Sequence, residues 1–176
     1  MIKKHYKKLF FFFTIFFIFT INLKASTPHF VDFKYILNES KAGKQAQDYL
    51  KKKLSDGMKK IQEQERAVQA EEQKIIKQKK VLSAEEYKKQ VSGLRTKVVN
   101  LQKQRNSLLE NVAKQRNKAK SELMKTLNPI ISDYMKENKV RMIIDKKAIL
   151  LADETLELTK EITDILNKNL KTIKLD

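Results

Sequence analysis

The sequence of 176 residues has no cysteine, no tryptophan, two prolines, two histidines and three glycines. Without cysteine, neither a disulfide framework nor a thiolate metal site can form. The glycines, at positions 43, 57 and 93, lie too far apart for a phosphate-binding loop, and the sequence has no G-x-S-x-G or H-E-x-x-H motif. His5 lies in an N-terminal leader, and we interpret His29 as an exposed linker residue. We therefore expect no enzyme, no catalytic residue, no metal and no cofactor, ATP included.

Residues 1–25 have the pattern of a secretory signal peptide. Four lysines among the first eight residues precede an apolar run from Leu9 to Ile21, and Leu23-Lys24-Ala25 offers a cleavage site. As a helix the run spans about 20 Å, short of the ~30 Å of a bilayer core. This length favours a cleaved leader over a membrane anchor. Together with the cysteine-free, lysine-rich composition, it predicts export to a periplasm.

Positive charge is concentrated in one segment of the chain. Residues 44–125 carry 22 Lys/Arg against 10 Asp/Glu, whereas the rest of the chain after the leader has 11 of each. The segment is helical in pattern, but its hydrophobic seam is too thin for a globular core. A long basic helical segment attached to a neutral body indicates a protein that binds another molecule and does not act as a catalyst.

The basic segment is predicted to be an antiparallel helical hairpin, an arm over residues 42–127. Apolar residues recur every seven positions in two series. The first is Leu54, Ile61, Val68, Ile75, Leu82, and the second is Tyr87, Leu94, Leu101, Leu108 with Val91 and Val98 between. Ser83 and Glu86 form a capping box that begins a second helix. The hairpin tip is therefore expected near residues 79–84, about 60 Å from the base. Gln, Glu and Gly in the seam, with Gly57 and Gly93 in the helices, predict a loosely held and flexible arm.

Residues 26–41 and 128–176 are predicted to form a small β-containing body, giving a mostly helical α+β protein. A strand over residues 30–33 should lead into a helix capped by Asn38 or Ser40. Pro129 should break or kink the second arm helix, and Asn138 should cap its end.

Two further elements are expected in the body. The runs 140–144 and 148–152 are predicted to pair as a hairpin of strands, and Thr159 should cap a last amphipathic helix. So small a core with exposed strand edges favours oligomerisation.

Three segments resemble the Skp/OmpH family of periplasmic chaperones: FVDFKYILNESKAGK (30–44), the Lys/Gln-rich hairpin, and ENKVRMIIDKKAILLADETLELTKEI (137–162). The resemblance implies a homotrimer whose strands form a barrel-like trimerisation body with three arms around a cavity. Family members hold unfolded outer-membrane proteins there without ATP. The residues that match the body strands are Phe30, Val31, Phe33, Val140, Met142, Ile144, Ile149, Leu150 and Leu151.

The predicted arm tip carries a cluster of basic and apolar residues. No acidic residue occurs between Glu72 and Glu85. The members of this tip cluster are Lys74, Ile75, Ile76, Lys77, Lys79, Lys80 and Val81. Two interpretations remain open: a contact patch for an unfolded client, anionic lipid or lipopolysaccharide, or a solvated helix end kept soluble by its lysines.

Two other functions compete with a chaperone. A sequence pI of about 9.9 also suits a binder of nucleic acid or another anionic polymer, and a coiled coil also suits an envelope scaffold. The leader and the excess of Lys over Arg argue against nucleic acid as a partner. The interrupted seam argues against a stiff scaffold.

Overall fold

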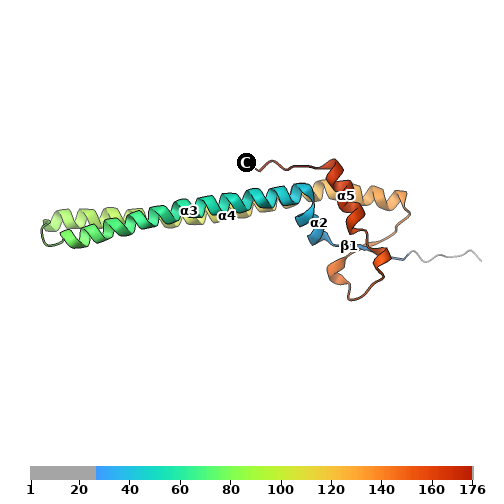
Figure 1. Ribbon diagram of the computed structural model, residues 1–176, viewed down its shortest axis with the longest axis horizontal. Coiled ribbons are helices and arrows are strands. Elements are labelled where there is room, and N and C mark those ends of the chain that lie inside the picture. Colours follow the sequence, from blue (N-terminus) through green and yellow to red (C-terminus); the bar gives the residue numbers. More distant parts are fainter. Residues whose placement is uncertain (1–26, 176) are drawn as a thin grey trace, which may run out of the picture.

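The computed structural model describes residues 27–175. A long helical hairpin projects from a small body that holds both ends of the described chain (Figure 1). The chain is mostly helical, with one two-stranded sheet. The predicted signal peptide lies outside the described residues.

The arm consists of α3 (Lys41–Gln78) and α4 (Ala84–Glu137), joined by a short turn. Ser40 caps α3 by accepting from the Gly43 amide. At the other end the Ser83–Glu86 capping box begins α4. The predicted hairpin, its tip and both caps are confirmed. By its 38 residues, α3 alone extends about 57 Å.

The chain enters the arm through a tight elbow between α2 (Phe33–Glu39) and α3. The Asp32 side chain caps α2 by accepting from the Tyr35 amide at 2.8 Å. Ser40, fully buried, ends α2 and begins α3. A Cβ at Gly43 would lie 2.1 Å from the Leu37 carbonyl oxygen, so only glycine allows this approach.

The sheet pairs two strands that are far apart in the sequence. β1 (His29–Val31) runs parallel to β2 (Ile143–Asp145), with Phe30 opposite Ile144. On its other side β1 meets the segment before the last helix, where the Leu158 amide donates to the Phe30 carbonyl at 2.9 Å. β1 is thus the centre of the body.

The predicted hairpin of strands after residue 140 is wrong. Asp145 accepts from the Lys147 amide and turns the chain into a 3₁₀ helix, η1 (Lys146–Ala148), after which Ile149, Leu150 and Leu151 form no strand. β2 pairs with β1 instead. The strand assignments of Phe33, Val140 and Met142 are also wrong, since Phe33 begins α2 and the other two precede β2 without belonging to it.

Two expectations about helix ends also need correction. α5 (Thr159–Asn169) follows a second 3₁₀ helix, η2 (Glu154–Leu156), and its N-cap is Leu158. The Thr159 hydroxyl is used elsewhere, accepting from the Asp32 amide at 2.8 Å. The predicted break at Pro129 is wrong, since α4 continues through it to Glu137, and the residues beyond the proline, Ile130, Ile131 and Tyr134, pack on the core. A kink at Pro129, the alternative, stays a prediction. Asn138 is the C-cap of α4, as predicted.

The hydrophobic core lies at the arm root, which we define as residues 42–50 of α3 and 119–127 of α4. Side chains from β1, α2, α5 and the segment after α5 join it there. Its buried members are Val31, Ile36, Ala42, Ala46, Leu50, Ala119, Leu123, Leu127, Leu158, Ile162, Leu166, Ile173 and Leu175. Beyond the root, buried apolar side chains on the described arm are Ile61, Ile75 and Leu101.

The two arm glycines differ in surroundings, which gives a test of arm stability. A Cβ at Gly93 meets nothing within 4 Å, whereas one at Gly57 would lie 2.6 Å from Leu108 Cδ2. Gly93→Ala should therefore raise the free energy of unfolding by about 1 kcal/mol through helix propensity alone. Gly57→Ala, the matched control, should gain less, because Leu108 must move. Urea unfolding followed by circular dichroism would measure both, and a larger gain at Gly57 would contradict the packing described.

Candidate functional site

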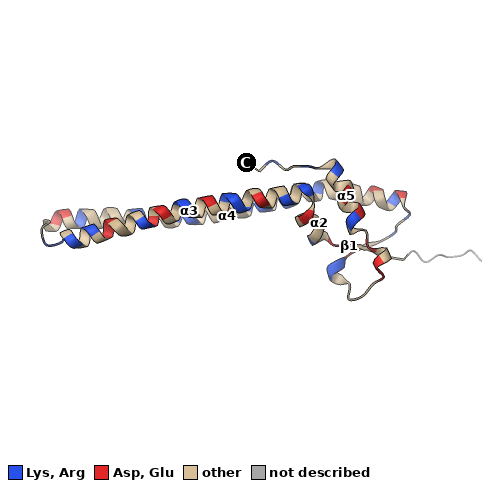
Figure 2. Cartoon of the chain, in the orientation of Figure 1, with Lys and Arg blue, Asp and Glu red and all other residues tan. Residues whose placement is uncertain are grey.

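Charged residues of both signs line the arm, with Lys and Arg spread along both helices (Figure 2). Two ion pairs cross from one helix to the other: Lys97 to Glu71 at 2.5 Å and Arg105 to Glu65 at 2.6 Å. These side chains are one third to one half exposed, so each pair contributes little stability. Such pairs mainly set the register between α3 and α4.

The middle of the arm has a polar layer in its seam. Gln64 Oε1 and Arg105 Nε are buried without a hydrogen-bond partner in the described structure. Gln64 lies beside Glu65 in sequence, and Glu65 pairs with Arg105 across the hairpin. Buried polar atoms without partners cost free energy. The interrupted heptads thus coincide with a polar layer in the seam, and the loosely held arm stays a prediction.

The tip cluster divides into an exposed and a buried part. All four lysines are exposed, and so are Ile76 (54%) and Val81 (82%). Ile75, in contrast, is 4% exposed and belongs to the seam. Lys79 Nζ lies 5.8 Å from the centre of the Tyr87 ring, which holds one lysine across the turn. The surface offered at the tip thus combines four lysines with two apolar side chains.

Other exposed apolar side chains on the arm were missed by the heptad analysis. Tyr49 on α3 and Val99 and Leu109 on α4 are 42–52% exposed. Val98, predicted to lie in the seam, is 52% exposed as well. Val99 and Leu109 each follow a heptad position directly, so an apolar residue beside the seam was the sequence feature that could have identified them. The remaining seam residues outside the tip are half-buried or buried, consistent with hairpin packing: Leu54, Ile61, Val68, Tyr87, Val91, Leu94, Leu101 and Leu108.

A groove of about 990 Å³ lies at the arm root between α2, α3, α4 and η1. Its apolar lining includes Phe33, Leu37, Leu123 and Met124. Its charged residues are the basic Lys34, Arg116, Lys120, Lys146 and Lys147 and the acidic Asp32 and Asp145, so basic residues are in excess. The groove thus repeats, in concave form, the combination of positive charge and apolar surface found along the arm.

The described residues contain no group of three or more His, Cys, Asp or Glu side chains placed to hold a metal ion. Nor does any helix within residues 27–175 have the length and hydrophobicity to cross a bilayer.

A family model for outer membrane proteins (OmpH-like) matches residues 29–166. The chain belongs to the OmpH-like family. A crystal structure from Caulobacter crescentus CB15, described as a candidate outer membrane chaperone (OmpH-like), has the same fold, with a TM-score of 0.77 and 20% sequence identity over 85% of this chain and 90% of that one. No curated protein sequence matches significantly. The resemblance found in the end segments and the hairpin is confirmed.

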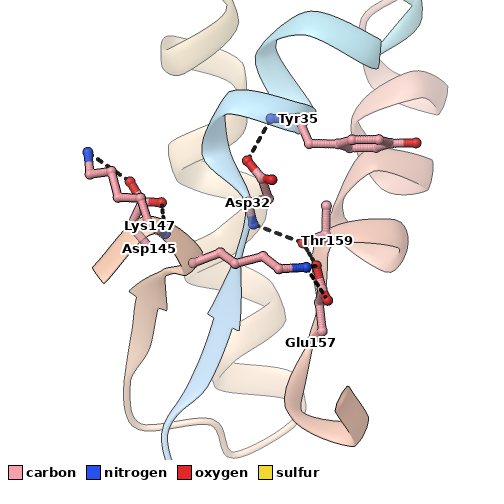
Figure 3. A network of polar contacts seen from close by, with 7 residues as sticks. Asp32, Tyr35, Asp145, Lys147, Glu157 and Thr159 are labelled. Carbon is pink, nitrogen blue, oxygen red and sulfur yellow. Dashed lines mark hydrogen bonds and ion pairs between the residues drawn. The ribbon is translucent and has the colours of Figure 1, made fainter. Parts of the chain in front are cut away.

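The OmpH-like body is joined by a polar network around β1 (Figure 3). The Thr159 hydroxyl accepts from the Asp32 amide and donates to Glu157 Oε1, both at 2.8 Å. Lys146 Nζ donates to both oxygens of Glu157, at 3.0 and 2.8 Å. Lys147 in turn pairs with Asp145 at 3.0 Å. The network links the first strand, η1 and the start of α5.

Three groups in the network have shifted pKa values, and the hydrogen bond from the Lys147 side chain lowers the pKa of Asp145. The hydrogen bond from Lys146, together with that from Thr159, lowers the pKa of Glu157 below its ordinary 4.5. The same contact raises the pKa of Lys146. Lys146 is 48% exposed and Glu157 25%, so solvent screens the pair.

The predicted trimerisation residues of this OmpH-like chain differ in burial. Phe30, Val31 and Val140 are buried within the chain, and Phe33, Ile144 and Ile149 are half-buried. Met142, Leu150 and Leu151 are 53%, 103% and 91% exposed. Two neighbouring leucines in full contact with water form a small apolar patch on the body.

The Glu157 carboxylate predicts an acid-dependent loss of body stability. A group whose pKa is lowered by folding stabilises the protein above its ordinary pKa, and this stabilisation is lost as the pH falls through the lowered value. Glu157→Gln should therefore reduce the free energy of unfolding at pH 7 by up to about 1 kcal/mol. The difference from the unchanged protein should shrink below about pH 4.5.

Urea unfolding between pH 7 and 3, at fixed protein concentration, measures this difference. Glu137→Gln is the matched control, since Glu137 forms no ion pair or hydrogen bond through its carboxylate within the described structure. A pH-independent difference for Glu157→Gln would show that the ion pair does not stabilise the body.

Proposed function

We propose that this OmpH-like protein is a periplasmic, ATP-independent holdase chaperone. It binds unfolded outer-membrane proteins in a cavity between the basic arms of a homotrimer and prevents their aggregation in transit. The observation that carries the proposal is the arm: 22 basic residues against 10 acidic ones, on helices that leave apolar side chains exposed between the charges. The Caulobacter crescentus structure, described as a candidate chaperone, supports the same class of function.

Charge and apolar contact have separate roles in the proposed mechanism. Exposed lysines attract acidic clients over a range of about 8 Å at physiological salt, which raises the encounter rate. They add little affinity once contact is made, because water screens them. Ile76, Val81, Val99 and Leu109 then retain the client through non-directional burial, which tolerates any sequence that offers apolar side chains. Several such contacts inside one cavity add up to firm capture.

The proposed trimer would form through the body. Its two-stranded sheet is small, and Leu150 and Leu151 are fully exposed in a single chain. Contact between copies would bury these leucines and leave the arms free. The predicted leader, residues 1–25, supports export, and its cleavage belongs to the same proposal.

The chaperone activity is tested with an unfolded barrel protein. When a urea-unfolded outer-membrane barrel protein is diluted into buffer containing a molar excess of the mature protein, light scattering should stay near the baseline. Scattering that rises as fast as in buffer alone would contradict the proposal. A tip variant with Lys74, Lys77, Lys79 and Lys80 each changed to Gln should capture the client more slowly at low salt, and the deficit should vanish at high salt.

The control for that variant removes the same charge from the body. It changes Lys139, Arg141, Lys168 and Lys171 to Gln, all exposed residues outside the groove. Its capture rate should exceed that of the tip variant at low salt. Equal salt dependence in the tip variant and the unchanged protein would assign the tip lysines to solubility alone.

The oligomeric state has its own measurement. Multi-angle light scattering of the native mature protein should give the mass of three chains. Leu150→Ser with Leu151→Ser should shift the mass toward that of one chain, because the exposed leucines are the proposed contact. A monomeric unchanged protein would contradict the trimer.

A further inference from the structure

The segment after α5, residues 170–175, follows the arm root as an extended strap. Leu170 ends α5 with extended backbone angles, φ −134° and ψ 108°. The strap then passes beside the first part of α3 (Figure 1), where the Ile173 amide donates to Gln45 Oε1 at 3.3 Å. Over residues 173–175 buried and exposed side chains alternate: Lys174 is exposed, and Ile173 and Leu175 are each only 7% exposed.

The surface beneath the strap is the apolar root of the arm. Ile173 and Leu175 join the same cluster as Ala42, Ala46 and Leu50 of α3. The strap belongs to neither a helix nor a strand, and the hydrogen bond to Gln45 is the one that the described residues 171–175 make. Side-chain burial, with little main-chain hydrogen bonding, therefore holds the strap. A surface that binds a segment mainly by burying its apolar side chains selects for the spacing of those side chains. It tolerates changes elsewhere in the sequence of the bound segment.

We propose that this surface is a client-binding site, which the strap occupies in the absence of client and leaves when a client segment competes for it. The expected occupant is an extended polypeptide segment with apolar side chains at alternate positions. The choice of client rests on the proposed chaperone function, since strands of outer-membrane barrels alternate apolar and polar residues with a period of two. Ile173 and Leu175 have this spacing, so the strap already shows what the surface accepts.

When a client segment displaces the strap, one set of apolar side chains replaces another on the same surface. The client segment buries apolar side chains where those of the strap were buried, so the exchange itself needs no ATP. The strap, being tethered, competes at a high effective concentration. Only a segment that also contacts the basic arm, or that carries a longer alternating run, should replace it.

A peptide experiment tests the surface without any chaperone assay. The probe is a labelled peptide of residues 167–175, followed by fluorescence anisotropy with the full mature chain. Ile173→Ser with Leu175→Ser should release the strap and let the peptide bind. If the strap covers the surface about 90% of the time, the peptide should bind the released variant about tenfold more tightly than the unchanged protein.

The matched control, Lys171→Ser with Lys174→Ser, changes exposed residues of the same strap and should bind like the unchanged protein. Equal affinity in all three proteins, or no binding to the released variant, would overturn the proposal.

A second variant keeps the buried strap residues Ile173 and Leu175 unchanged and guards against misfolding. Gln45→Cys and Thr172→Cys introduce the sole thiols of the chain at two exposed positions, which a short bismaleimide can bridge. The bridged protein should not bind the peptide and should capture an unfolded barrel protein at least threefold more slowly than the same protein before bridging. Peptide binding that is unaffected by the bridge would overturn the proposal. If the protein binds the peptide as expected but never suppresses aggregation, the proposed binding surface is supported. The proposed chaperone function is then contradicted.

Discussion

The apolar cluster at the arm root is the constraint on which the rest of the structure depends. It brings together side chains from β1, α2, both arm helices and α5, including Val31, Ile36, Leu127 and Ile162. The segments before α2 and after α4 are therefore both held near the root end of the hairpin (Figure 1). Most of the buried apolar side chains of the described chain lie in this cluster. The arm beyond it must therefore remain helical with few tertiary contacts.

The arm beyond the root owes its form mainly to local interactions. Its caps at Ser40 and Ser83, and helices with one proline in 92 residues, favour two long helices without a wide packed face. Above the root only Ile61, Ile75 and Leu101 are buried among the described apolar residues of the arm, and the other seam residues are half-buried at most. Separation of the helices there therefore exposes less apolar surface than opening of the root cluster would. Local opening of the hairpin should thus cost much less free energy than unfolding of the body. The Glu65–Arg105 and Glu71–Lys97 pairs align the helices without locking them.

The features that the sequence predicts well are those with local causes. The hairpin, its tip, the capping box and the Asn138 cap depend on residues within one or two helical turns, so periodicity and cap patterns reveal them. The strand partner of Ile143–Asp145 could not be found in this way, because it is His29–Val31 at the other end of the chain. A β-branched run shows that a strand is favoured but does not say which strand it pairs with. Asp145, interpreted as part of a hairpin turn, starts a 3₁₀ helix by the same short-range capping.

In the candidate site, too, the features with local causes could be predicted from the sequence, and those that depend on helix packing could not. The positive charge of the tip was evident from the sequence, but the exposure of each apolar side chain was not, since it depends on how α3 faces α4. Ile75 and Ile76 are neighbours of equal chemistry, yet one lies in the seam and the other in solvent. A rotation of about 100° per residue around the helix separates them. Heptad spacing could place Ile75 in the seam and Val99 and Leu109 beside it, whereas the degree of exposure of each side chain needed the structure.

In the proposed assembly, association through the body brings together several arms, each of which alone would bind a client too weakly. A single arm presents scattered apolar contacts, each too small to retain a client, and its lysines act over a range much shorter than the arm itself. Capture therefore requires several arms around one client. The body supplies a reason for several copies to associate, because Leu150 and Leu151 are exposed in one chain and would be covered by another. Association at the body leaves the arms apart, since the root cluster lies between the two regions and is already filled within each chain. An assembly of this kind gains its stability at one end and its capacity for clients at the other.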